Sequence, residues 1–124
     1  MAITLNSSTN RLTFNDNSFQ KDLPIGVSPQ TWQNVNSSRS FSTNYTNSTN
    51  MPIVVLISIT AGNESNNGVQ VLVDGVEIAR VGKETGNNGG NQYYSCLVIV
   101  QPGSTYNVQV YGSTPGKDYW WELR

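Results

Sequence analysis

The sequence contains no histidine and a single cysteine, Cys96, among its 124 residues. The absence of histidine excludes Ser-His-Asp catalysis, Cys-His catalysis and histidine-based zinc sites. One cysteine can form neither an intrachain disulfide nor a zinc site built from several thiolates. Cys96 lies within the largely apolar segment Tyr93–Val100, which predicts a buried structural thiol rather than a reactive one.

Charged residues are also scarce, at 12% of the chain, and the formal net charge is -1. There is no broad basic field to hold nucleic acid or an anionic membrane surface. The longest apolar run is far shorter than the ~20 residues of a membrane helix. The start of the sequence, Met-Ala-Ile-Thr, lacks the basic and apolar regions of a signal peptide. We therefore expect a protein with no membrane insertion and no secretion signal.

Paired carboxylates are the one enzymatic option that this composition leaves, because a glycosidase needs only two acids about 5 to 9.5 Å apart. Asp74 is explained as a turn residue, and most of the other acids lie in polar segments. No spaced metal-ligand motif accompanies them. We expect no catalytic residue, no cofactor and no metal site. The eight acids are Asp16, Asp22, Glu64, Asp74, Glu77, Glu84, Asp118 and Glu122.

The residues that are abundant, Asn, Ser, Thr, Gly, Val and Tyr, favour strands and tight turns over helices. At this length one hydrophobic core is the expected number. Short alternating segments between turns predict an all-β fold, an antiparallel, jelly-roll-like β-sandwich, over residues 31–124. Residues 1–30 are predicted to form an N-terminal arm, with a β-hairpin of residues 3–5 and 11–14 and an extended connector. A hairpin this small needs support from the sandwich or from a neighbouring subunit.

The clearest local pattern is the segment Val69–Arg80, which has Asp-Gly at its centre. Asp74-Gly75 fits a two-residue type I′ turn, because glycine accepts positive φ readily and aspartate tolerates it. This register pairs Val73 with Val76 and Leu72 with Glu77. It also pairs Val71 with Ile78.

Other strands are predicted where apolar residues alternate or run together. Ile53–Thr60 begins with five apolar residues, so we expect a central core strand covered on both faces. In the segment 39–45, Phe41, Thr43 and Tyr45 are expected on one face of a strand. The adjacent Trp120 and Trp121 must point to opposite faces, which places one in the core. The remaining predicted strands cover residues 32–35, 92–100 and 105–111.

Two segments resemble bacteriophage structural proteins. Leu12–Gln20 resembles the "L-x-F-x-D-G-T-x-Q" segment of tail-fibre and related proteins, with Asn17 where that pattern usually has glycine. Over residues 31–124 the chain is similar to the "W-x-x-V … R … Y-T-N … x-P-I-x-V" opening of tail-fibre tip domains, followed by Pro-Gly with a tyrosine three residues on and a C-terminal "W-x-E-L". The matching residues are Trp32, Val35, Arg39, Tyr45, Thr46, Asn47, Pro52, Ile53, Val55, Pro102, Gly103, Tyr106, Trp120, Trp121, Glu122 and Leu123.

The resemblance implies a compact β-sandwich or jelly-roll module of a virion, commonly trimeric and without an agreed catalytic residue. Two non-enzymatic functions follow. One is a tail-fibre-like module for attachment or host-surface receptor binding. The alternative is a capsid decoration or cement protein whose arm pins neighbouring subunits. A polysaccharide depolymerase is less favoured.

Both functions predict self-association as a homotrimer, since a small neutral domain with many aromatic residues has surface to cover. The other expected partners are virion proteins and a host-surface glycan or protein, and the expected location is the virion, after synthesis in the host cytoplasm.

The candidate contact residues, apart from Tyr119, lie on or beside three polar loops, residues 46–50, 62–68 and 82–91. Loops on a rigid scaffold often carry recognition, but every domain also keeps its solvated turns there. The aromatic residues form either a sugar-stacking platform or the core and the subunit contacts. Tyr94 and Tyr119 are the expected exposed ones, because each lies beside a polar loop. The candidate contacts are Asn47, Asn66, Asn67, Asn87, Asn88, Tyr94 and Tyr119.

Overall fold

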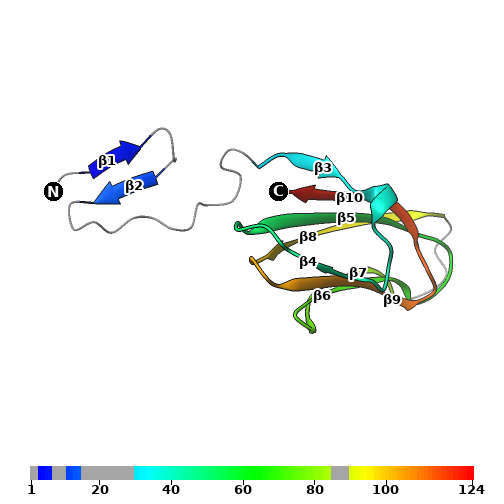
Figure 1. The fold of residues 1–124 in the computed structure, drawn as a ribbon. Helices are drawn as coiled ribbons and strands as arrows, with labels where there is room; N and C mark the ends of the chain where they lie inside the picture. The colour runs from blue at the N-terminus through cyan, green and yellow to red at the C-terminus, as the bar shows by residue number, and fades with distance from the viewer. Residues whose placement is uncertain (1–2, 7–10, 15–29, 85–89) are drawn as a thin grey trace.

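The computed structural model describes residues 3–6, 11–14, 30–84 and 90–124. Within these residues the regular structure is strands, apart from one 3-10 turn, η1 (Asn36–Ser38). The strands form two four-stranded antiparallel sheets and a two-stranded hairpin (Figure 1). The predicted all-β antiparallel sandwich is therefore confirmed. The described part of the chain holds no helix with the length and apolarity to span a membrane.

The first sheet has the strand order β3-β10-β5-β8 and the second has the order β4-β9-β6-β7. The strands of the first sheet are β3 (Trp32–Asn34), β10 (Gly116–Leu123), β5 (Ile53–Ala61) and β8 (Gln92–Val100). Those of the second sheet are β4 (Asn44–Thr46), β9 (Thr105–Gly112), β6 (Asn67–Val73) and β7 (Val76–Lys83). The pairs are nested, β6 with β7, β5 with β8, β4 with β9 and β3 with β10, so the first strand of the sandwich lies beside the last.

The core lies between the two sheets, which Figure 1 shows as stacked layers. The inward residues of β5, Val55, Ile57 and Ile59, are fully buried. They belong to one hydrophobic cluster with Val108 of β9 and Trp120 of β10. As predicted, β5 is an internal strand. Its outward face is buried at Val54 and half-buried at Leu56, Ser58 and Thr60, so the prediction that both faces are covered holds only in part.

The Asp-Gly hairpin has the predicted turn, because φ is 50° at Asp74 and 81° at Gly75. Val73 pairs with Val76 and Leu72 with Glu77, as expected. The predicted pairing of Val71 with Ile78 is wrong, because the register shifts and Val71 pairs with Ala79. Ile78 is the extra residue of a β-bulge. Beyond it, the residues of β7 point to the face opposite to the one that simple alternation predicts. Ile78 is therefore exposed, whereas Ala79 packs against the core.

The segment 39–45 is not the continuous strand that alternation predicts, because only Asn44–Thr46 is a strand. Ser42 has a φ of 58°, which interrupts the extended backbone. Phe41 and Tyr45 both pack against the core, but Thr43 is exposed. The turn also brings the Arg39 side chain inward, where its partners lie on distant strands.

The N-terminal hairpin is present as predicted, with β1 (Ile3–Asn6) paired to β2 (Arg11–Phe14). These two strands form a sheet of their own. The predicted connector falls mostly on residues 15–29, which lie outside the described residues. The division of the chain into an arm and a sandwich domain at residue 30 remains a prediction.

Candidate functional site

A buried carboxylate joins the last strand to distant parts of the chain. Glu122 of β10 is fully buried, and Arg39 binds it twice, from Nε to Oε1 at 2.8 Å and from Nη2 to Oε2 at 3.1 Å. Tyr106 of β9 donates its hydroxyl to the same carboxylate. Arg124 Nε lies 3.2 Å from Oε2. The carboxylate therefore ties the first sheet to the second and to the turn before β4.

An aromatic cluster surrounds this ionic group. Trp120 lies 6.2 Å from Phe41 and 6.1 Å from Tyr45 between ring centroids, and Tyr45 lies 5.7 Å from Tyr106. Arg39 stacks over the Tyr45 ring at 4.4 Å. Burial, and then the hydrogen bond to Glu122, raise the pKa of Tyr106. The phenol is therefore a hydrogen-bond donor at neutral pH. Arg39, Glu122, Tyr106 and the aromatic rings around them link the two sheets, and we call this group the cross-brace.

In the cross-brace, the carboxylate of Glu122 is paired with cations rather than with a second acid. Glycoside hydrolysis needs a second carboxylate beside the first, whereas Glu122 is bound by two arginines and a phenol. Among the residues that the structure describes, no three His, Cys, Asp or Glu side chains gather closely enough to hold a metal ion.

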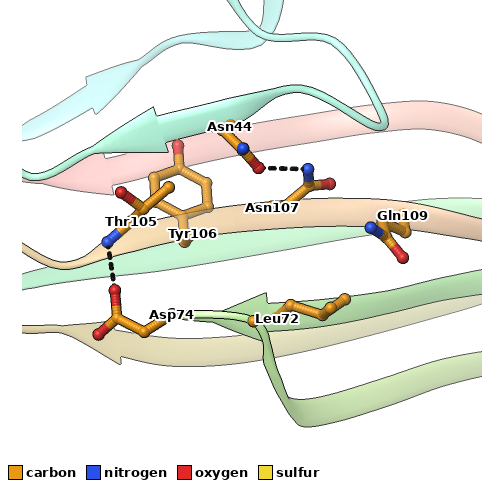
Figure 2. Close-up of a pocket in the computed structure, with 8 residues that line it drawn as sticks. Asn44, Leu72, Asp74, Thr105, Tyr106, Asn107 and Gln109 are labelled. Atoms are coloured by element: carbon orange, nitrogen blue, oxygen red, sulfur yellow. Dashed lines mark hydrogen bonds between the residues drawn. The ribbon is translucent and has the colours of Figure 1, made fainter.

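A polar pocket of about 340 Å³ lies beside the Asp-Gly turn (Figure 2). Figure 2 shows the two hydrogen bonds that join its walls, from Thr105 N to Asp74 Oδ1 at 2.8 Å and from Asn107 Nδ2 to Asn44 Oδ1 at 2.7 Å. The Thr105 N–H, and next the Ser104 hydroxyl, lower the pKa of Asp74. Most of the polar groups in this pocket thus hold the loops and strands together, and a ligand would have to displace them.

A second polar pocket, of about 450 Å³, lies at the opposite end of β6, where Asn67 lines it with Asn63, Glu64 and Asn91. Asn67 is only 5% exposed, and its Oδ1 has no hydrogen-bond partner among the described residues. The Asn63 amide is already engaged, because its Oδ1 accepts the backbone N–H of Gly90 at 2.9 Å. This pocket offers hydrogen-bonding groups but no aromatic ring.

The third pocket has a volume of about 580 Å³. Of these three pockets, it alone is lined by two exposed aromatic rings. Tyr93 of β8 is 73% exposed and Tyr119 of β10 is 58% exposed. We call it the tyrosine pocket, and its lining residues are Ser58, Tyr93, Lys117, Asp118 and Tyr119.

The outer face of the first sheet is apolar at the end that carries residues 54 and 56 of β5. Register places its outward side chains in two rows across the four strands, one of Ile99, Val54, Leu123 and Trp32, and one of Leu97, Leu56, Trp121 and Asn34. Leu97, Ile99 and Trp32 are 54%, 47% and 48% exposed. We call the seven apolar residues of these rows the apolar outer face. They are Trp32, Val54, Leu56, Leu97, Ile99, Trp121 and Leu123.

The outer face of the second sheet has the opposite character. Gln70 Nε2 donates to Gln109 Oε1 at 3.0 Å, and Arg80 Nη2 donates to Gln70 Oε1 at 2.9 Å. Arg80 also pairs with Glu77. Amides and charges therefore cover the middle of this sheet, and its exposed apolar residues, Val76 and Ile78, lie near the Asp-Gly turn.

The predicted contact residues have separate locations. Asn66 and Tyr119 are exposed, and Asn87 and Asn88 lie outside the described residues. Asn47 is 2% exposed and its Nδ2 donates to Val100 O at 3.0 Å and to Met51 O at 2.8 Å, so it holds two loops together. Asn67 is also buried.

The expectation that Tyr94 is exposed is wrong. It packs against the core and its hydroxyl donates to Gln92 Oε1 at 2.6 Å. Val98 and Val100 face the core, so the even-numbered residues of β8 point inward and Tyr93 points outward. The alternation in residues 92–100 predicts that Tyr93 and Tyr94 point to opposite faces of the strand. It does not indicate which of the two faces is buried.

The half-buried Cys96 packs against the core, and burial raises its pKa to about 11. The prediction of a structural thiol agrees with this position, although Cys96 is not fully buried. Comparison of the chain with known proteins finds no matching family model, no matching curated protein and no matching solved structure.

Proposed function

We propose that this chain is a non-enzymatic structural module of a bacteriophage virion, tail-fibre-like, which serves attachment or binding to the host surface. The observation that carries the proposal is the contrast between the two sheets. One presents the apolar outer face with the tyrosine pocket at its end, and the other presents hydrogen-bonded amides and charges. The apolar outer face suits contact with neighbouring copies, and the tyrosine pocket at its end suits contact with the host surface.

The nested strand pairing supports a finer description of the fold. Eight strands in two sheets of order β3-β10-β5-β8 and β4-β9-β6-β7 fit a jelly roll, in which a long folded ribbon wraps into two layers. Jelly rolls recur in viral capsid and lectin domains. The same fold serves many functions, so the function of this chain depends on its surface.

Self-association follows from the same surface. Three residues of the apolar outer face, Trp32, Leu97 and Ile99, are exposed, and a partner that removes them from water is favoured. Leu97 and Ile99 lie on β8, which is the edge strand of its sheet and so has a free ladder of backbone groups. We propose a homotrimer in which the apolar outer face meets neighbouring copies.

One observation favours the alternative, a capsid decoration or cement protein. In the N-terminal hairpin Ile3 pairs with Phe14 and Leu5 pairs with Leu12, so two of the four residue pairs are apolar. A two-stranded hairpin is marginal alone and needs a surface to lie on. An arm of this kind suits a protein that reaches across to a neighbouring subunit.

Electron microscopy of the phage particle tests both functions. An epitope tag at the C-terminus, decorated with Fab, is expected at the distal end of the tail. Decoration of the head surface would support the cement function instead. Particles that carry no Fab, although a tagged capsid protein in a parallel preparation is decorated, would exclude both.

A further inference from the structure

The tyrosine pocket is formed by three neighbouring strands of the first sheet. Tyr93 of β8 pairs with Thr60 of β5, and Tyr119 of β10 pairs with Ser58 of β5. Because β5 lies between the other two, the strands that bear the tyrosines are about 9.6 Å apart. The two rings therefore flank a floor that contains Ser58. This spacing suits an extended ligand with more than one ring.

A β-bulge brings the acidic residue to the same pocket. Residues adjacent in a regular strand point to opposite faces, yet Asp118 and Tyr119 both line the pocket. The register of β10 against β5 shifts between Lys117 and Tyr119, which makes Asp118 the extra residue. Thr60 Oγ1 donates to Asp118 Oδ2 at 2.6 Å and so fixes the carboxylate. Asp118 Oδ1 has no hydrogen-bond partner among the described residues.

The charge of the pocket comes from that carboxylate. Lys117 Nζ donates to the backbone carbonyls of Asn36 and Arg39, so its ammonium group is held by the turn on the far side of β10. Ser58 contributes a hydroxyl, which shares a 3.1 Å hydrogen bond with Ser95. The polar groups that remain for a ligand are an anionic acceptor and hydroxyls, and these groups disfavour an anionic ligand.

We propose that the tyrosine pocket binds a neutral oligosaccharide. Tyr93 and Tyr119 stack against the apolar C–H faces of two sugar rings, and Asp118 Oδ1 accepts a hydrogen bond from a sugar hydroxyl. Acidic glycans are rejected by the same carboxylate. The inference rests on the proposed function, because it names the class of host-surface molecule that the module would bind.

The test uses the full chain and saturation-transfer NMR with isothermal titration. The probes are three neutral trisaccharides, maltotriose, cellotriose and mannotriose, and two acidic ones, trigalacturonic acid and sialyllactose. We expect binding of at least one neutral trisaccharide and none of the acidic ones. Failure of all three neutral probes, or tighter binding of an acidic probe, would overturn the proposal.

Variants assign the binding to the pocket. Tyr93→Ala and Tyr119→Ala each weaken binding about tenfold, whereas Tyr119→Phe keeps the ring and loses less than about threefold. Asp118→Asn weakens binding of the neutral sugar and reduces the discrimination against trigalacturonic acid. Ile78→Ala, at an exposed apolar residue of the second sheet that lies outside the pocket and outside the apolar outer face, is the matched control and leaves the affinity unchanged. Equal affinities for all these variants would contradict the proposal.

The result can be separated from the proposed function. A chain that is found on the tail but fails to bind these sugars keeps its structural role and loses only this inference. A chain that binds neutral trisaccharides through Tyr93 and Tyr119 but is absent from the particle keeps the binding site and loses the virion function.

Discussion

Arg39 Nε lies 2.8 Å from Glu122 Oε1, although 83 residues separate them in the sequence. The pair joins the turn before β4 to the last strand, and the Glu122 side chain is only 1% exposed. Breaking a buried ion pair from one side is costly, because the remaining charge stays in a medium that solvates it poorly.

Arg39→Ala is therefore expected to lower the free energy of unfolding by about 3–5 kcal/mol. Urea unfolding followed by tryptophan fluorescence measures this loss. The double variant Arg39→Met/Glu122→Leu, in which both charges are replaced by apolar side chains, should recover most of it. A loss below about 1 kcal/mol in Arg39→Ala would show that Arg124 alone compensates the charge of Glu122.

The adjacent tryptophans provide a matched comparison. Trp120 is fully buried and packs on Phe41 and Tyr45, whereas Trp121 lies on the apolar outer face and is half-buried. Trp120→Ala should cost about 3–5 kcal/mol of unfolding free energy because it leaves a cavity. Trp121→Ala should cost about 1 kcal/mol in the isolated domain. Thermal unfolding of both variants checks the order, and equal losses would contradict the placement of the core.

Cys96 should react slowly with thiol reagents. Its pKa is raised by burial to about 11. At pH 8 about one thiol in a thousand is then ionised, against roughly a quarter for a free thiol of pKa about 8.5. Alkylation by iodoacetamide in the folded protein should be slower by about a hundredfold than in urea, and should accelerate about tenfold per pH unit from pH 8 to pH 10. Modification at the rate of the unfolded chain would show that Cys96 is not held in the core.

Asp74 makes the stability of the turn depend on pH. Its pKa is lowered in the folded state, first by the Thr105 N–H and then by the Ser104 hydroxyl. A lowered folded pKa gives a contribution that is present above the unfolded pKa of about 3.9 and is lost as pH falls through the folded pKa. Asp74→Asn, which still tolerates positive φ, should be less stable than the wild type at pH 6 and should approach it at pH 2. A difference between the two proteins that stays constant over this range would exclude the carboxylate as its source.

Local sequence patterns predicted those parts of the fold that depend on local chemistry. The extents of β8 and the turn at Asp74-Gly75 follow from alternation and from the φ preference of glycine, and both agree with the structure. The opposite orientation of Trp120 and Trp121 follows from the two-residue period of a strand. These features need no knowledge of distant residues.

The errors have causes that the alternation of residues does not reveal. A bulge at Ile78 exchanges the faces of β7, and alternation alone has no signal for an inserted residue. Arg39 leaves the expected strand because its partner, Glu122, comes from the last strand. The exposed ring of β8 is Tyr93 rather than Tyr94, because the packing of β5 decides which side of β8 is inside. The tyrosine pocket depends on the register of β8, β5 and β10, which the sequence patterns do not predict.

Sedimentation equilibrium of the wild type and of Leu97→Lys tests the central claim most directly, namely that the apolar outer face is an adhesive surface. Leu97 is 54% exposed, so lysine is tolerated in the monomer, but a charge there opposes burial against a second copy. Val76→Lys, at a site 61% exposed on the second sheet, is the control. We expect trimers for the wild type and for Val76→Lys at micromolar concentration, and monomers for Leu97→Lys. A wild type that remains monomeric, or a Leu97→Lys variant that still forms trimers, would contradict the claim.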